Sequence, residues 1–281
     1  MTALRGVSVA DALDSALVAL NAADVDSPRL DAELLLSLSL GVDRAQLVMH
    51  PERELEPAAA RQFRELVRRR AVDREPLAYI TGRKAFRHIE LEVDPRVLIP
   101  RPETELLVEV GLTLPAGTHV HDLGTGSGAI ALALKQERPD LVVSGSDASH
   151  DAISVAIANA RRLGIDVLFT PADWGKLPPH TNAVLCNPPY VAERDRTTLA
   201  PELRHEPAEA LFAGEDGLDA IRAITSGKVG WPLEGPLLIA LEVGAGQART
   251  VEAMLRAAGL ERTAVKRDLA GIDRVVIGWR S

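Results

Sequence analysis

The sequence predicts an α/β fold in which a small N-terminal helical bundle precedes a mostly parallel, doubly wound sheet. Three observations predict this fold. Apolar residues recur at helical spacing through the first 75 residues. From residue 118 onward, short apolar runs alternate with helical patterns, as in chains that form parallel sheets. A glycine-rich turn joins the first of these runs to the helical pattern that follows it.

The segment 1–75 is predicted to contain at least three helices. The apolar stripe of the first comprises Val9, Leu13, Leu17 and Leu20. Ser27 followed by Pro28 is typical of a helix start, and Gly41 ends the apolar run that they open. Pro57 begins another helix, whose apolar stripe comprises Phe63, Leu66 and Val67. Because these stripes must bury one another, we expect a helical bundle.

The segment 76–100 mixes β-forming residues with glycine and proline, and we expect a linker that contains a short hairpin. The third segment, 101–281, is predicted to be one larger domain. It opens with a helix from the run Pro100–Glu105 through Val110, where carboxylates in the first turn favour the helix dipole.

Strands and helices are then predicted to alternate. The strands are expected at 118–123, 141–146, 166–170, 182–186 and 237–243, and the helices at 127–137, 150–163, 217–229 and 246–258. The runs 264–267 and 274–279 flank Gly271 and predict an antiparallel pair at one edge of the sheet. The segment 191–216 is long for a loop in a compact domain, so we expect it to be a lid or a peptide-docking surface.

Composition and charge narrow the function classes. The net charge of −8 argues against sequence-independent nucleic-acid binding, which usually needs a basic surface. A basic stretch comprises Arg61, Arg64, Arg68, Arg69, Arg70 and Arg74, and we interpret it as the solvated face of a helix. The single cysteine, Cys186, lies in an apolar run and is expected to be a buried structural thiol in a reducing compartment. No signal peptide or membrane-spanning run is predicted.

The most informative motif is Asn187-Pro188-Pro189-Tyr190, directly after the apolar run 183–186. The side-chain oxygen of Asn187 and the carbonyl of Pro188 are acceptors, and the proline rings restrict the backbone that holds them. Tyr190 offers a flat face on which a planar group can stack. The motif therefore suits an amide or an exocyclic amine, and the alternative is an ordinary proline-rich turn.

A second motif is the turn 124–128, which reads Gly-Thr-Gly-Ser-Gly between a predicted strand and a predicted helix. Its glycines allow the backbone to approach a ligand closely, but the spacing differs from the dinucleotide fingerprint. Asp122 precedes the turn, and Asp147 ends the next apolar run, where a carboxylate can accept from both ribose hydroxyls. This pattern looks like the S-adenosylmethionine (SAM) loop of Rossmann-like methyltransferases. His119 and His121 alternate on the strand before it, but no third metal ligand is evident, and we expect no metal site.

Several motifs occur together in the order typical of one enzyme family. They are Leu98-Ile99-Pro100-Arg101-Pro102-Glu103-Thr104-Glu105, Asp122-Leu123-Gly124-Thr125-Gly126-Ser127-Gly128, Asn187-Pro188-Pro189-Tyr190, Glu206-Pro207, Ala210-Leu211, Gly214, Asp216-Gly217-Leu218 and Glu242-Val243-Gly244. With them the chain resembles the peptide-chain release factor glutamine methyltransferases of the HemK/PrmC type. The resemblance covers 76–281 motif by motif, whereas the helical segment resembles the family only in size and position.

The resemblance implies a Rossmann-like SAM-dependent methyltransferase sheet. It also implies N5-methylation of the glutamine in the Gly-Gly-Gln motif of class 1 release factors, which act in translation termination. SAM would be the cofactor and S-adenosylhomocysteine the product. The implied cofactor-binding residues are Gly124, Thr125, Gly126, Ser127, Gly128, Asp147, Trp174 and Asn187. The implied substrate-binding residues are Asn187, Pro188, Pro189 and Tyr190, of which Asn187, Pro188 and Tyr190 would be catalytic.

For two of the implied site segments, a structural role remains as an alternative to cofactor binding. Trp174 would lie near the adenine, or it is a loop aromatic without that role. The turn from Arg101 to Thr104 would close over the methionine end of the cofactor, or it caps the helix that follows. We also expect a cytoplasmic protein whose bundle docks the release factor, because a glutamine side chain alone offers too little surface for specificity. We expect no binding to membrane and no direct binding to nucleic acid.

Two other functions remain open at this point. A methyltransferase for adenine N6 or guanine N2 would use the same Asn-Pro-Pro-Tyr turn on an exocyclic amine. The acidic charge and the absence of a large added target-recognition domain argue against it. A non-catalytic SAM-binding adaptor is the other, and the intact glycine turn and Asn-Pro-Pro-Tyr turn argue against that.

Overall fold

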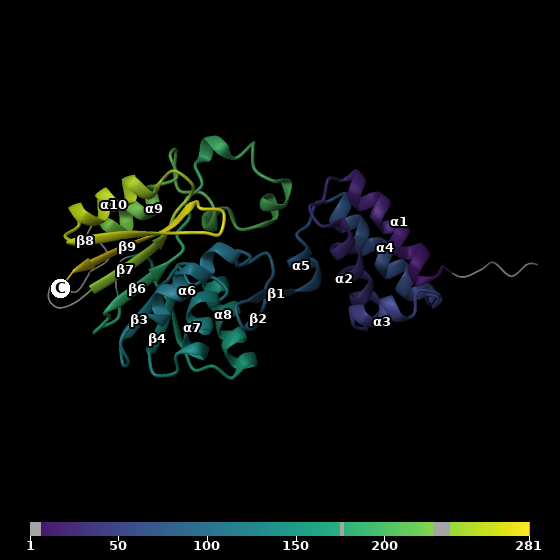
Figure 1. Ribbon diagram of the computed structural model, residues 1–281, viewed down its shortest axis with the longest axis horizontal. Coiled ribbons are helices and arrows are strands. Elements are labelled where there is room, and N and C mark those ends of the chain that lie inside the picture. The colour runs from purple at the N-terminus through teal and green to yellow at the C-terminus, as the bar shows by residue number, and fades with distance from the viewer. Residues whose placement is uncertain (1–6, 175–176, 227–236, 281) are drawn as a thin grey trace, which may run out of the picture. The chain divides into compact units, whose positions relative to one another are not determined.

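The structure is a computed structural model that describes residues 7–174, 177–226 and 237–280. It consists of two compact units, whose elements are labelled in Figure 1. The first unit contains the chain up to Gly82 together with Pro201–His205, and the second contains Arg83–Ala200 and the chain from Glu206 onward. Residues 76–82, which we assigned to a linker, thus group with the helices, and the expected hairpin groups with the sheet.

The first unit is helical, as predicted. Its helices are α1 (Val9–Ala22), α2 (Pro28–Leu40), α3 (Arg44–Met49), α4 (Pro57–Ala71) and α5 (Leu77–Thr81). Helix α2 follows Ser27 and ends at Gly41, whose φ of 64° is left-handed and favours glycine. Helices α3 and α5 were not predicted, because six and five residues are too few to show a helical period.

The core of the first unit forms where α1, α2 and α4 meet. The predicted stripe of α4 is buried, and so are Val9, Leu13 and Leu20 of α1. They pack into one cluster with Ala32, Leu35 and Leu36 of α2. Helix α1 starts with a capping box, in which Ser8 and Asp11 satisfy each other's backbone N–H groups.

The basic stretch is only in part the solvated face that we predicted. Arg61, Arg64 and Arg68 are exposed. Arg70, in contrast, is buried, and its guanidinium donates to Asp31 at 2.7 Å and to Glu202 at 2.8 Å. The prediction was wrong for Arg70 because its two acidic partners lie 39 and 132 residues away in the sequence, where no helical pattern reveals them.

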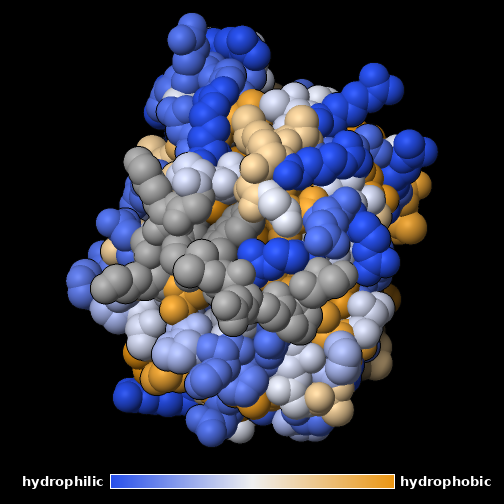
Figure 2. Space-filling view, turned by 90° about the vertical axis from the view of Figure 1, so that its left-hand side faces the viewer, coloured by the Kyte–Doolittle hydropathy of each residue, from blue (hydrophilic) through white to orange (hydrophobic). Residues whose placement is uncertain are grey.

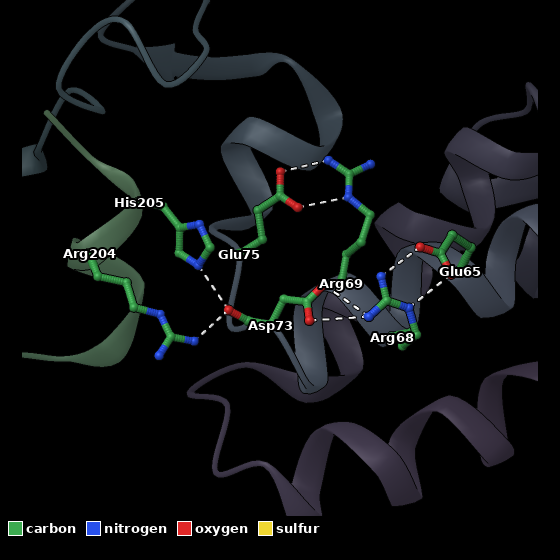
Figure 3. A network of polar contacts seen from close by, with 7 residues as sticks. All are labelled: Glu65, Arg68, Arg69, Asp73, Glu75, Arg204 and His205. Carbon is green, nitrogen blue, oxygen red and sulfur yellow. Dashed lines mark hydrogen bonds and ion pairs between the residues drawn. The ribbon is translucent and has the colours of Figure 1, made fainter.

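The end of α4 and the following turn carry a polar network that also holds the segment Pro201–His205 (Figure 3). Arg69 forms a bidentate ion pair with Glu75, at 2.7 and 2.6 Å. The backbone carbonyl of Asp73 accepts from Arg204 at 2.7 Å and from the ring Nε2 of His205 at 2.8 Å. These two bonds tie Pro201–His205 to the first unit.

Replacing Arg70 tests how much the buried ion pairs contribute to the free energy of unfolding. Arg70→Ala leaves the carboxylates of Asp31 and Glu202 without this partner, so we expect about 3–5 kcal/mol less free energy of unfolding for this unit. The exposed Arg64→Ala is the matched control and should change it by less than about 0.5 kcal/mol. Denaturant titration followed by helical circular dichroism measures both. Equal stability of the two variants would refute the structural role of Arg70.

The second unit contains the predicted sheet. Its strands are β3 (His119–Leu123), β4 (Val142–Asp147), β5 (Leu168–Pro171), β6 (Ala183–Cys186), β7 (Leu237–Glu242), β8 (Arg262–Arg267) and β9 (Asp273–Arg280). Their order is β5-β4-β3-β6-β7-β9-β8. The first five are parallel to one another, whereas β9 runs antiparallel to both β7 and β8. This order confirms a mostly parallel sheet with an antiparallel pair at its edge. The expected hairpin is β1 (Arg83–Phe86) with β2 (Ile89–Glu92).

The helices of the second unit cover both faces of this sheet. They are the 3-10 turn η1 (Pro102–Thr104) with α6 (Glu105–Leu112), α7 (Ala129–Glu137), α8 (His150–Leu163), α9 (Asp219–Thr225) and α10 (Ala248–Ala257). Figure 1 shows α6, α7 and α8 on one side and α9 and α10 on the other. The predicted helix 217–229 corresponds to α9, and its residues 227–229 lie outside the described part of the chain.

Because helices lie on both faces, the central strands β6 and β7 are buried at every position. On the visible face in Figure 2, hydrophilic residues cover most of the surface that is not grey, and hydrophobic residues form separate patches. Among the helices in the described ranges, none has the length and apolar content required to cross a membrane.

Candidate functional site

A cavity of about 510 Å³ lies in the second unit, at the edge where the parallel strands end. Its walls come from the residues that follow β3, β4, β5 and β6, the stretch before α6, the loop 207–214, and helix α9. In doubly wound sheets, ligands bind in the crevice outside the carboxyl ends of the strands. The cavity therefore has the position of a ligand site in this fold class.

Residues 124–127 of the glycine turn line the cavity beside β3. The N–H groups of Gly124 and Thr125 donate to the carbonyl of Ser146 at 2.8 and 2.9 Å, which fixes the turn against β4. Gly124 and Gly126 have φ values of 76° and 55°, a region that glycine adopts without strain. The turn is thus bent so that little side-chain bulk faces the cavity.

The buried side chain of Asp122 holds the glycine turn in place through hydrogen bonds. Its Oδ2 accepts from the hydroxyl of Thr125 at 2.6 Å and from the N–H of Ala131 at 3.2 Å. Burial raises the pKa of its carboxyl to about 7, and its Oδ1 has no hydrogen-bond partner within the described residues. The side chain joins the end of β3 to the start of α7.

Asp147 ends β4 and lines the cavity. Its Oδ2 accepts from the N–H of Gly126 at 2.9 Å, and its Oδ1 accepts from the N–H of Ser149 at 2.9 Å. Burial raises its pKa, and the two backbone donors oppose that rise. Each oxygen retains a second lone pair, so the held carboxylate can still accept from a ligand's hydroxyls.

Trp174 lies against the glycine turn. A Cβ placed on Gly124 would come within 3.3 Å of the Cη2 atom of Trp174, and both residues line the cavity. The indole ring thus covers the turn, and a side chain at position 124 would crowd it.

The Asn-Pro-Pro-Tyr turn follows β6, which is a neighbour of β3 in the sheet. The side-chain nitrogen of Asn187 donates to the hydroxyl of Thr104 at 3.2 Å. With the amide held in this way, its Oδ1 accepts no hydrogen bond from the described residues. The carbonyl of Pro188 likewise has no donor within the described residues. Neither of the two acceptors that the motif predicts is thus used by a described residue, and of the two residues Asn187 lines the cavity.

The other residues of this turn differ in position. Asn187 and Pro189 line the cavity, Pro188 is buried, and Tyr190 is half-buried. The hydroxyl of Tyr190 donates to Glu242 at 3.2 Å, and burial raises the pKa of that phenol. The side chain of Gln247 donates to the Tyr190 carbonyl at 3.0 Å, so the end of the turn is held by the N-cap residue of α10.

The cavity thus collects nearly all residues that the sequence suggested for a cofactor. Gly124, Thr125, Gly126, Ser127, Asp147, Trp174 and Asn187 all line it. Gly128 does not. It lies at the start of α7 with a φ of 85°, where a Cβ would meet Leu132 and Phe169. Its role is therefore to let the helix pack closely on its neighbours.

The segment 191–216, which we expected to be a lid or a peptide-docking surface, contributes its residues 207–214 to a wall of the cavity. Pro207, Glu209, Phe212 and Gly214 line it. The preceding Glu206 is buried, accepts from the N–H of Ile99 at 2.9 Å and pairs with Arg101. The motif Glu206-Pro207 and the length of the loop were the available signals, but neither specifies where the loop folds back.

Two further polar residues lie beside the turn. Thr104 lines the cavity, while Glu242 ends β7 and is 1% exposed. Thr104 occupies the N-cap position of α6, but its side chain makes no capping bond there. Glu242 belongs to the motif Glu242-Val243-Gly244 named above, and its place at the end of an otherwise apolar strand was a further signal in the sequence.

Two other candidate residues are structural. Cys186 is fully buried, and burial raises the pKa of its thiol, which matches the predicted structural thiol. The ring nitrogens of His121 contact the hydroxyls of Ser144 and Ser146 at 2.9 and 2.8 Å. Burial lowers the pKa of His121 to about 4, so the ring is neutral and part of the sheet's packing.

Comparison with protein-family models matches both units. Residues 11–82 match the PrmC N-terminal domain, and residues 102–216 match the methyltransferase small domain.

Full-length relatives are also similar to this chain. Proteins named release factor glutamine methyltransferase are 41% identical in Coxiella burnetii, with 90% of this chain and 92% of the relative covered, and 42% identical in Cereibacter sphaeroides, with 95% and 96% covered. Among solved structures, the hMettl16 catalytic domain in complex with the MAT2A 3'UTR hairpin 6 has a TM-score of 0.55 at 15% identity. That match covers 79% of this chain and 81% of the other, and it shows a shared fold.

Proposed function

The chain belongs to the family of release factor glutamine methyltransferases, and we propose that it methylates a class 1 peptide-chain release factor. The acceptor is the side-chain nitrogen of the glutamine in the Gly-Gly-Gln motif, and the methyl donor is SAM. The observation that carries the proposal is Asn187, which lines the cavity at the end of β6 with an Oδ1 that accepts from no described residue and is followed directly by the Pro188 carbonyl.

The residues of the cavity fit SAM. The bent glycine turn allows a close approach of the ligand, and Asp147 presents a carboxylate that suits ribose hydroxyls. Trp174 offers an aromatic face over the turn. The volume of about 510 Å³ lies in the range of small-molecule sites.

SAM supplies a methyl group that is already activated by its sulfonium. The task of this chain is to make an amide nitrogen reactive, because its lone pair is delocalised into the carbonyl. Asn187 Oδ1 and the Pro188 carbonyl can accept the two N–H bonds of the glutamine amide and orient it. The same two acceptors stabilise the positive charge that develops on nitrogen. Once the methyl group has been transferred, one proton on the nitrogen becomes acidic and is lost to solvent, so no strong general base is required. Positioning and electrostatics therefore account for the rate.

Asp147→Ala tests the cofactor half of the proposal. We expect SAM to bind more weakly by about 1.5–3 kcal/mol, since hydrogen bonds to a charged acceptor are worth this much. Asp166→Ala, at an exposed position of the same unit, is the control and should leave the affinity unchanged. Titration calorimetry measures both. An Asp147→Ala protein that is folded and binds SAM as the parent does would remove Asp147 from the site.

We further propose that the helical unit docks the release factor, because a glutamine side chain alone offers too little surface for specific recognition. The reaction is then cytoplasmic, as its protein substrate acts in translation. Nucleic acid is not the substrate in this proposal, in keeping with the net charge of −8.

The test is methyl transfer from labelled SAM to separate acceptors: purified class 1 release factor, duplex DNA and structured RNA. We expect label in the release factor alone. Label in DNA or RNA and none in the release factor would make the chain a nucleic-acid methyltransferase. Binding of SAM without transfer to any of the three would make it a SAM-binding adaptor.

A further inference from the structure

We propose that Gln247 is a positioning residue for methyl transfer. Its side-chain amide holds the backbone carbonyl of Tyr190 and so fixes where the Asn-Pro-Pro-Tyr turn places its two acceptors. The proposal rests on the proposed function of the cavity and deepens it. It assigns a role to a residue that does not line the cavity and that belongs to none of the motifs named above.

The side chain of Gln247 joins two turns that follow neighbouring strands of the sheet, β6 and β7. Its Nε2 donates to the Tyr190 carbonyl, in the turn after β6, at 3.0 Å. Its Oε1 accepts from the N–H of Gly244, in the turn after β7, at 2.9 Å. The backbone N–H of Gln247 also donates to the Gly244 carbonyl at 3.1 Å. Gln247 is thus fixed at the start of α10 and reaches the end of the Asn-Pro-Pro-Tyr turn.

The two hydrogen bonds determine which end of the Gln247 amide faces which partner. A backbone N–H can only donate, and a backbone carbonyl can only accept. The amide oxygen must therefore face Gly244, and the NH2 group must face Tyr190. A glutamate has the same shape, but as a carboxylate it lacks the donor that the Tyr190 carbonyl requires.

The surroundings of Tyr190 are closely packed. A Cβ on Gly217 would lie 2.2 Å from the Tyr190 carbonyl oxygen, and one on Gly244 would lie 3.3 Å from the ring atom Cδ2 of Tyr190. Packing of this kind limits how far the carbonyl can move, but it supplies no hydrogen bond. Within the described residues, Gln247 is the only donor to this carbonyl. The position of the carbonyl therefore depends on the Gln247 amide.

A displacement at Tyr190 reaches the acceptors because the turn is short and stiff. Asn187 follows β6 directly, and the pairing of β6 with β3 and β7 fixes that end. Pro188 and Pro189 lie between the two ends, and each proline ring restricts its own φ and the residue before it. With few free torsions in between, the Asn187 side chain and the Pro188 carbonyl depend on where Tyr190 is held.

The main test is Gln247→Glu, which keeps the shape of the side chain. One carboxylate oxygen can still accept from Gly244, but the other faces the Tyr190 carbonyl without a proton, so the two oxygens repel. Single-turnover methyl transfer at pH 8 should fall about tenfold, because packing limits the shift to less than the roughly 1 Å that can cost on the order of 10². Affinity for SAM should stay near that of the parent, since Gln247 does not line the cavity.

Gln136→Glu is the matched control, because it makes the same change at an exposed position of the same unit. It should keep the parent rate of methyl transfer and the parent affinity for SAM.

The pH dependence separates positioning from a merely structural role. A protonated carboxyl presents a donor beside an acceptor, as glutamine does. Its pKa should lie above the usual value of about 4.3, since partial burial and a facing carbonyl oxygen both favour the neutral form. The ratio of the Gln247→Glu rate to the parent rate should therefore rise as pH is lowered from about 8 to about 5. Glu242, whose pKa burial raises to about 7, titrates in both proteins, and the ratio removes its contribution.

A structural role alone would give a different result. If Gln247 served only to bind the N–H of Gly244 at the start of α10, the carboxylate would keep that bond. The Gln247→Glu rate would then equal the parent rate at every pH.

A second variant and a measurement on the parent keep the proposal testable if Gln247→Glu folds poorly. Gln247→Ala removes both bonds without adding a charge, and methyl transfer by the folded protein should again fall about tenfold, with the affinity for SAM near that of the parent. In the parent, one side-chain NH2 proton of Gln247, assigned by its loss in Gln247→Ala, should show slowed hydrogen exchange.

Three results would overturn the proposal. They are a folded Gln247→Glu protein with the parent rate at pH 8, a rate ratio that does not rise as pH falls, or fast exchange of both NH2 protons in the parent. The exchange measurement requires no methyl acceptor. A parent with slowed exchange that fails to methylate release factor would contradict the proposed function and leave the hold on Tyr190 intact. A folded Gln247→Ala protein that methylates release factor as fast as the parent would contradict the positioning role and leave the proposed function intact.

Discussion

Asn187→Ala is expected to lower the single-turnover rate of methyl transfer to release factor by about 10²–10³, the usual cost of losing one positioned electrostatic partner of developing charge. Alanine removes Oδ1, which no described residue uses, and Nδ2, which is held by Thr104. The rate should fall more than the affinity for SAM, although the turn borders the cavity and some weakening of SAM binding is expected. Circular dichroism would confirm that the variant is folded.

Asn187→Asp refines this test. A carboxylate still accepts from the reacting amide, and its charge assists the positive charge that develops on nitrogen. It also attracts the sulfonium in the ground state, which by itself gives no rate advantage. We therefore expect Asn187→Asp to transfer methyl groups faster than Asn187→Ala and more slowly than the parent. A parent-like rate for Asn187→Ala would show that Asn187 does not accept a hydrogen bond from the glutamine amide of the substrate.

Gly217→Ala should cause the second largest fall in the rate of methyl transfer. Gly217 packs against the backbone of Tyr190, the last residue of the same turn. A Cβ at this position would overlap the carbonyl oxygen of Tyr190, and Gly217 has a φ of 77°, where other residues are strained. The Tyr190 backbone must then move, and with it the acceptors of the Asn-Pro-Pro-Tyr turn. Misplacement of a reacting group by about 1 Å can cost on the order of 10² in rate.

The chain offers a matched control for the strain alone. Gly271 has a φ of 78°, but a Cβ there would meet no atom within 4 Å. Gly271→Ala should therefore lose about 1–2 kcal/mol of stability from its backbone and keep the parent rate of transfer. If both glycine variants transfer methyl groups equally fast, close packing behind Tyr190 does not position the site.

The parts of the fold that depend on local pattern were predictable. Ser27, Pro28 and Gly41 delimit α2, and the run before Asn187 is β6, because caps and apolar periods act over a few residues. The site residues at the ends of β3, β4 and β6 were predictable for the same reason. Parallel strands bring their carboxyl ends to one edge, so motifs that follow them converge.

Contacts between distant segments were not predictable in this way. The burial of Arg70 depends on Asp31 and Glu202, which only the tertiary fold brings to it. The hydrogen bond from Tyr190 to Glu242 depends on β6 and β7 being neighbours in the sheet. Such pairings leave no period in a single sequence, because each partner lies on a different element.

The most direct test of the central claim is to locate the transferred methyl group. Release factor would be incubated with this protein and SAM, digested, and its peptides fragmented by mass spectrometry. The account predicts one methyl group on the side-chain nitrogen of the glutamine in Gly-Gly-Gln, and none when Asn187→Ala replaces the parent for the same short reaction. A methyl group on another residue of the release factor, or the same yield from Asn187→Ala, would contradict it.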